Sequence, residues 1–177
     1  MKVSLNNEKS IDRAINQITR YRDSLNERSE KFIRKLLNVG IKTAKIHTGQ
    51  YSGYIKFEKD INGTQGMLIA TNGKKLVKEW YNKNGAKIGS YEVSPILLAE
   101  FGSGWLANVV WDVTGVGQGT MPNSMGHATD ANGWQWYDKN GVRHWSRGEL
   151  PTYPMHSALV AMMQEIHTIG QEVFKYG

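Results

Sequence analysis

The first third of the chain has the hydrophobic pattern of one long amphipathic helix. Its apolar residues recur at steps of three, four and seven positions, which places them on one face of an α-helix. They are Ile11, Ile15, Ile18, Leu25, Phe32 and Leu36. No proline interrupts this stretch, and its first glycine is Gly40. The pattern predicts an N-terminal helix within residues 1–48.

The predicted helix is long for a chain of 177 residues. At 1.5 Å per residue it would extend for about 55 Å, which exceeds the diameter of a compact domain of this size. Two outcomes are open. The helix breaks, near residues 23–26, or it projects from its domain and packs against a neighbour, which would favour oligomerisation.

After Gly49 the pattern changes to that of β-strands. Short runs of β-branched and aromatic residues alternate with turn signals at Asp60–Gly63, Asn72-Gly73 and Asn84-Gly85. Asn-Gly pairs favour the type I′ turns that close β-hairpins. We therefore expect an antiparallel β-meander over residues 51–93.

One hexapeptide occurs twice, as WYNKNG at Trp80–Gly85 and as WYDKNG at Trp136–Gly141. Each copy predicts a hairpin, with Asn-Gly in the turn and Trp-Tyr making cross-strand contacts. The second hairpin covers residues 134–146, and we expect both to be scaffold elements. The alternative is a binding module, because the second copy resembles the repeats of choline-binding and glucan-binding modules of bacterial surface proteins. Those repeats run in tandem about twenty residues apart to build aromatic cages, whereas an unrelated segment separates these two.

The rest of the chain predicts two more helices around a glycine-rich segment. A short helix over residues 94–101 begins with Pro95, a residue favoured in the first turn. Residues 102–133 follow as a long loop, which we expect to be mobile until a partner orders it. A C-terminal helix over 152–175 has an apolar stripe at Met155, Leu159, Met162, Ile166, Ile169 and Val173.

The whole chain is thus expected to be a single α+β domain, residues 1–177, with its antiparallel meander packed against the N-terminal and C-terminal helices.

Composition excludes several classes of function. The chain has no cysteine, so it has no disulfide framework, thiol nucleophile or cysteine-ligated zinc site. Lys and Arg outnumber Asp and Glu by 22 to 16, a net charge of +6 that favours weak, sequence-independent contact with a polyanion. No apolar run approaches the ~20 residues of a membrane helix, and the opening residues lack the apolar core of a signal peptide.

Recognisable catalytic or metal-binding patterns are missing from the sequence. Its histidines form no HExxH motif and no pair spaced by four on a helix, and they are His47, His127, His144, His156 and His167. Its carboxylates in the second half are isolated as well. We therefore expect a protein that is not an enzyme and that needs no cofactor and no metal.

Two short motifs carry a resemblance to a known family. After the meander the motif consists of Leu97, Leu98, Glu100, Phe101, Gly102, Ser103 and Gly104. Further on, Pro151, Pro154 and Met155 form a Pro-x-x-Pro-Met segment that opens the last helix. With the order of elements, these motifs resemble the tail-completion or head–tail joining proteins of long-tailed bacteriophages, often called minor tail or neck proteins. The path between the motifs is longer here than in many such proteins, which makes the second hairpin an elaboration.

The resemblance implies a structural role in a phage or prophage particle. Members of that family are non-enzymatic α+β subunits that assemble into a ring, usually six-fold, at the tail end that faces the capsid. The implied partners are further copies of the chain and the neck and tail-tube proteins, while DNA passes through the ring without being read. The implied location is the virion, and the host cytoplasm during assembly. The motif residues Glu100, Phe101, Gly102, Gly104, Pro151, Pro154 and Met155 are then the candidates for an interface.

Overall fold

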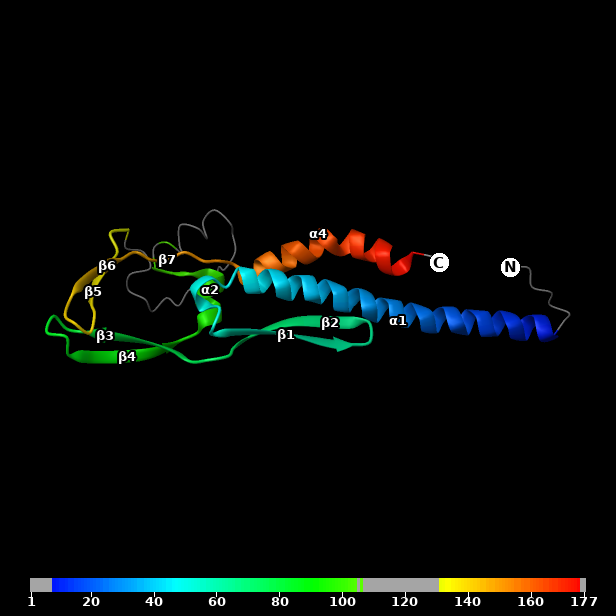
Figure 1. Ribbon diagram of the computed structural model, residues 1–177, viewed down its shortest axis with the longest axis horizontal. Coiled ribbons are helices and arrows are strands. Elements are labelled where there is room, and N and C mark those ends of the chain that lie inside the picture. Colours follow the sequence, from blue (N-terminus) through cyan, green and yellow to red (C-terminus); the bar gives the residue numbers. More distant parts are fainter. Residues whose placement is uncertain (1–7, 105, 107–130, 176–177) are drawn as a thin grey trace.

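The computed structural model describes residues 8–104, 106 and 131–175. Its elements confirm the α+β class, with antiparallel strands between a long first helix and a C-terminal helix (Figure 1). In chain order they are α1 Glu8–Ile46, the short 3-10 helix η1 Gly49–Tyr51, β1 Ile55–Asn62, β2 Gln65–Asn72, β3 Leu76–Tyr81, β4 Lys87–Val93, α2 Pro95–Phe101, β5 Trp134–Tyr137, β6 Arg143–Ser146, β7 Gly148–Glu149 and α4 Pro154–Phe174. Most of the expected loop over residues 102–133 lies outside the described residues, so its mobility stays a prediction.

Helix α1 is one uninterrupted element of 39 residues. At 1.5 Å per residue it is about 58 Å long, and it has no break near residues 23–26. Figure 1 shows its N-terminal half extending past both α4 and the β1–β2 hairpin. Of the two outcomes expected from the sequence, the structure has the projecting helix.

Strands β1 and β2 form a two-stranded sheet that packs on α1. Their register pairs Asn62 with Gln65, so the turn consists of the two residues between them rather than of Asp60–Gly63. The turn expected at Asn72-Gly73 is wrong, because Asn72 ends β2 and closes no hairpin. Its side chain instead bonds to the hydroxyl of Ser94, at 3.0 Å, and accepts from the backbone N–H of Ile96, at 3.3 Å. Asn72 thus fixes the start of α2.

The other strands form a second sheet with the order β4-β3-β5-β6. The meander expected as one sheet over residues 51–93 is therefore divided between two sheets. The physical reason is the pairing of β3, which uses one edge for β4 and the other for β5, so that no edge remains for β2. Tyr81 of β3 is paired with Tyr137 of β5, which places the two WYxKNG hairpins side by side.

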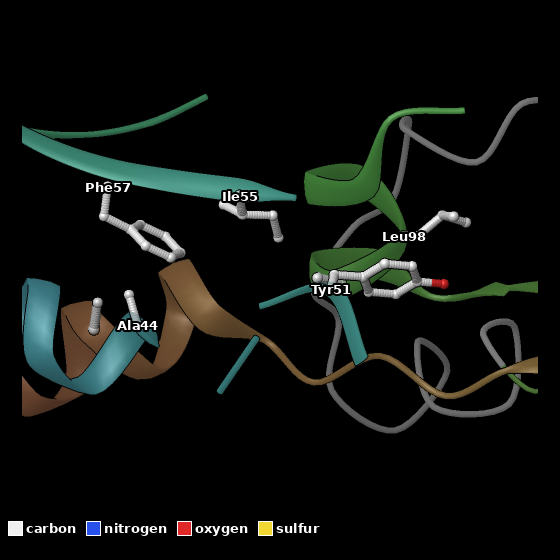
Figure 2. Packing of buried hydrophobic residues seen from close by; sticks show 7 residues of the cluster. Ala44, Tyr51, Ile55, Phe57 and Leu98 are labelled. Atoms are coloured by element: carbon white, nitrogen blue, oxygen red, sulfur yellow. The ribbon is translucent and has the colours of Figure 1, made fainter. Parts of the chain in front are cut away.

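The core lies where α1, α4, β1 and α2 meet. Figure 2 shows Ile55 and Phe57 pointing from β1 towards the helices, with Ala44 of α1 below Phe57. The buried cluster consists of Ala44, Tyr51, Ile55, Phe57, Leu98, Ala99 and Ala158. Helix α4 runs antiparallel along α1 from this cluster to Phe174, whose ring meets that of Phe32 at 5.7 Å. Towards its N-terminus, α1 continues past the end of α4 (Figure 1).

Candidate functional site

The two motifs that carry the family resemblance meet in the structure. Glu100, at the end of α2, is buried, and its carboxylate accepts hydrogen bonds from the backbone N–H groups of Met155, at 2.7 Å, and His156, at 2.9 Å. These groups belong to the first turn of α4, where four N–H groups have no partner within the helix and the dipole favours a negative charge. Tyr153, the residue before α4, makes no side-chain cap of its own. Glu100 supplies the cap from another element.

The backbone strengthens the same junction. The carbonyl of Ala99 accepts from the N–H groups of Thr152, at 2.7 Å, and Tyr153, at 3.1 Å. Gly102 has a φ of 68°, and a Cβ atom there would lie 2.4 Å from the carbonyl oxygen of Glu149. Only glycine fits both this conformation and this close approach. The segments on either side of the long loop are thereby tied together.

The candidate interface residues are therefore placed at an internal junction. Glu100, Gly104 and Pro154 are buried, and the other four are at most half-exposed, namely Phe101, Gly102, Pro151 and Met155. This geometry assigns them the task of positioning α4 against α2. A partner would reach only part of their surface in the chain as described.

An aromatic cleft lies on one face of the four-stranded sheet. It has a volume of about 400 Å³ and is closed at one end by α2 and β7. Its aromatic walls are Trp80, Tyr91, Trp134 and Trp136. The ring of Trp80 lies over Gly89, its cross-strand neighbour, and 5.2 Å from the ring of Tyr91. The sequence indicated the two hairpins but not that they would share one cleft.

A polar cluster around Glu149 closes the same end of the cleft. The carboxylate of Glu149 is 2.6 Å from the ammonium group of Lys78, and it accepts from the hydroxyl of Tyr51 and from the amide of Gln50, the latter at 3.1 Å. Burial, and then the bond to Glu149, raise the pKa of Tyr51 well above its ordinary value. The tyrosine therefore stays protonated and keeps donating. Sequence reasoning treated Glu149 as isolated, because its partners lie about 70 and 100 residues away in the chain.

The cleft is lined by aromatic side chains, with Lys78 and Glu149 as an ion pair at one end. The carboxylate of Glu149 pairs with the ammonium group of Lys78 and accepts hydrogen bonds from Tyr51 and Gln50. Among the described residues, no group of three or more His, Cys, Asp and Glu side chains could hold a metal ion. What the cleft can do is stack a flat or apolar ligand face on its indole rings and donate or accept hydrogen bonds at its polar end.

Two rows of apolar side chains are exposed on the described parts of the helices. The first, the α1 stripe, consists of Ile15, Ile18, Tyr21 and Leu25, which are between 39% and 66% exposed. The second, the α4 stripe, consists of Leu159, Met163 and Ile166, which are between 51% and 64% exposed. The sequence placed Leu159 and Ile166 on the face of the last helix that packs inward. That part of the prediction is wrong, because Ala158, Ile169 and Val173 form the buried face.

Comparison of the chain with known protein families, curated proteins and solved structures found no match. In the part of the chain that the structure describes, no helix has the length and apolar character needed to cross a membrane.

Proposed function

We propose that the protein is a non-enzymatic structural subunit that assembles into a ring at the head–tail junction of a phage or prophage particle. The α1 stripe carries this proposal. It lies on the half of α1 that extends past α4 and the β1–β2 hairpin, and its four side chains are between 39% and 66% exposed. Apolar side chains grouped on an exposed surface mark interaction sites in soluble proteins. A projecting helix with such a stripe suits a subunit whose fold is completed by neighbours.

The Glu100 junction supports the same proposal. The motifs behind the resemblance to tail-completion proteins form one contact, in which Glu100 caps α4 and Gly102 approaches β7. A resemblance whose separate motifs meet in space is stronger than one whose motifs lie apart. The junction also holds α4 in the orientation that leaves the α4 stripe exposed.

The charge of the chain fits a ring through which DNA passes. A net charge of +6 tolerates phosphates, and weak non-specific affinity of about 10⁻⁴ to 10⁻⁶ M at physiological salt would let DNA move without being held. The particle, and the host cytoplasm during assembly, would be its locations. Neck and tail-tube proteins would be its neighbours.

The proposal is tested by measuring mass in solution. Light scattering is recorded on the chain over a range of concentrations, alone and with a neck or tail-tube protein of the same phage. The proposal predicts a mass of at least twice 20.0 kDa for the chain alone, or a complex with the added protein that contains more than one copy of the chain. A mass of 20.0 kDa in every condition would contradict it.

The aromatic cleft favours a second candidate function, the binding of a glycan. Trp80 and Trp136 are each 39% exposed, so each ring keeps a face available for stacking on a sugar. A choline cage fits less well, because the nearby carboxylate of Glu149 is occupied by Lys78. Titration with a glucan oligomer, read from tryptophan fluorescence in the intact protein and in Trp136→Ala, separates this candidate from the first.

A further inference from the structure

We propose that the α1 stripe of one copy packs against the α4 stripe of a second copy of this chain. The inference rests on the proposed function and names the two surfaces that would join the subunits. The α1 stripe comprises Ile15, Ile18, Tyr21 and Leu25, and the α4 stripe comprises Leu159, Met163 and Ile166.

The α1 stripe continues a surface that already binds a helix. Leu25 lies two helical turns before Phe32, and Ile18 lies two turns before Leu25, so all three share one line along α1. At Phe32 this line is covered by α4, through the contact with Phe174. Helix α4 ends at Phe174, and the same line continues to Leu25 and Ile18, which are 39% and 66% exposed. The surface therefore has the shape and chemistry of a helix-binding face.

The two stripes cannot meet within one chain. Gly40 of α1 lies against Met162, the neighbour of Met163 in α4. Ile18 precedes Gly40 on the same uninterrupted helix, about 33 Å away along the axis at 1.5 Å per residue. A straight helix cannot fold back over that distance, so a second molecule has to supply the contact.

The opposite charges of α1 and α4 favour α4, rather than a second α1, as the helix that packs on the α1 stripe. Helix α1 contains ten Lys and Arg residues against five Asp and Glu, whereas α4 contains two Glu and neither Lys nor Arg. Within the chain, Lys35 of α1 already forms an ion pair with Glu172 of α4. Two α1 helices placed side by side would bring two basic helices together, which costs free energy.

A contact between two different stripes also explains how the chain would form a ring. Each copy would use its α1 stripe on one neighbour and offer its α4 stripe to the next. Such heterologous contacts generate rings when the rotation between subunits closes. Pairing of α1 with α1 would use the same surface on both copies and would stop at a dimer.

The test uses the absence of cysteine from the natural chain, since each introduced thiol is then unique. Proteins with Ile15→Cys, Ile18→Cys or Leu25→Cys are each mixed with Met163→Cys protein and oxidised. Three positions are needed because a disulfide forms only when the two Cα atoms lie within about 7 Å. The control is Arg13→Cys, five residues before Ile18 and so about 140° away around the helix.

The proposal predicts a disulfide-linked dimer, of twice 20.0 kDa, in at least one α1-stripe mixture with Met163→Cys. The yield should be at least about tenfold above that of the Arg13→Cys mixture and of each variant oxidised alone. Equal crosslinking in an α1-stripe variant alone would show that α1 pairs with α1 and would overturn the inference. Oligomers by light scattering without a specific crosslink would overturn the inference but leave the proposed ring. A chain that stays monomeric in every condition would overturn both.

Discussion

Gly85 and Gly141 occupy equivalent positions in the two WYxKNG turns, and each lies against the backbone of the other turn. Their φ angles are 75° and 74°. A Cβ atom on Gly85 would lie 2.7 Å from the carbonyl oxygen of Lys139, and one on Gly141 would lie 2.7 Å from that of Lys83. The repeated hexapeptide is thus a pair of turns that pack reciprocally where β3 meets β5.

Substitution of either glycine should destabilise the protein more than its backbone conformation alone explains. Placing an alanine at positive φ lowers the free energy of unfolding by about 1 kcal/mol. In Gly85→Ala and Gly141→Ala the new Cβ atom also clashes with a carbonyl oxygen of the other turn. We expect each to lower the free energy of unfolding by about 2 kcal/mol or more in urea titrations.

A third glycine provides the matched control. Gly63 has a φ of 57°, but a Cβ atom there would meet nothing within 4 Å. Gly63→Ala should therefore show the conformational cost of about 1 kcal/mol alone. If Gly63→Ala, Gly85→Ala and Gly141→Ala lowered the free energy of unfolding equally, the two turns would not pack against each other in solution.

The carboxylate of Glu100 should matter more than an ordinary surface charge. Glu100→Ala removes both acceptors of the first turn of α4 and should lower stability by about 2 kcal/mol, while Glu100→Gln, which keeps one acceptor, should lose less. Amide exchange at Met155 and His156 should accelerate in the alanine variant. The control is Glu58→Ala, at an exposed position on β1. An unchanged unfolding midpoint in Glu100→Ala would show that α4 does not depend on this cap.

Asp138 makes the second hairpin sensitive to acid. The hydrogen bond from His144, and then the backbone N–H groups of Val142 and Asn140, hold the pKa of Asp138 below its ordinary value. The charged carboxylate therefore stabilises the folded state above the unfolded pKa, near 4, and this contribution is lost as the pH falls through the lowered folded pKa.

A single substitution tests this contribution. The first hairpin has Asn82 where the second has Asp138, and the Oδ1 atoms of both residues accept from the same two backbone positions. Asp138→Asn should therefore keep the turn and remove the titration. Between about pH 5 and pH 2 the variant should lose less stability than the natural protein. If the free energy of unfolding in urea had the same pH dependence in both proteins, Asp138 would not contribute to the acid sensitivity.

The turns show where sequence reasoning succeeded and where it failed. Both hairpins were predicted in their positions, because the Asn-Gly pairs and the flanking apolar residues are local signals. The type I′ assignment was wrong, since Asn84 and Asn140 do not have positive φ and only the glycines do. The missed signal is the residue two positions before each asparagine, namely Asn82 and Asp138. The side chain of each accepts hydrogen bonds from backbone N–H groups of its turn and so stabilises a different turn geometry.

The relationships between distant segments could not be predicted from the sequence. The helical stripe of α1 was visible in the spacing of its isoleucines, but its exposure depends on where α4 ends. The cleft was hidden for a related reason, because Lys78, Glu149 and Tyr51 come from separate elements. Local patterns define elements, whereas such contacts follow from tertiary packing.

The cleft itself provides a test of the scaffold interpretation. If the aromatic residues serve the sheet, choline or a glucan oligomer at about 10 mM, well above the dissociation constant of a weak site, should leave tryptophan fluorescence unchanged. Trp136 stacks on His144 at 4.4 Å, so Trp136→Ala should lower stability instead. A saturable response that Trp136→Ala abolishes without loss of stability would favour glycan binding as the function.

The proposed assembly subunit would associate through the projecting half of α1. Light scattering on the natural protein and on Ile15→Glu/Ile18→Glu, with Arg13→Glu as a charge control, tests this association most directly. We expect the natural protein and the control to reach at least twice 20.0 kDa alone, or to form a complex with a neck or tail-tube protein that contains more than one copy of the chain. The double variant should remain at 20.0 kDa with unchanged circular dichroism, because charges on the stripe prevent its burial. The same mass for all three proteins in every condition would contradict the account.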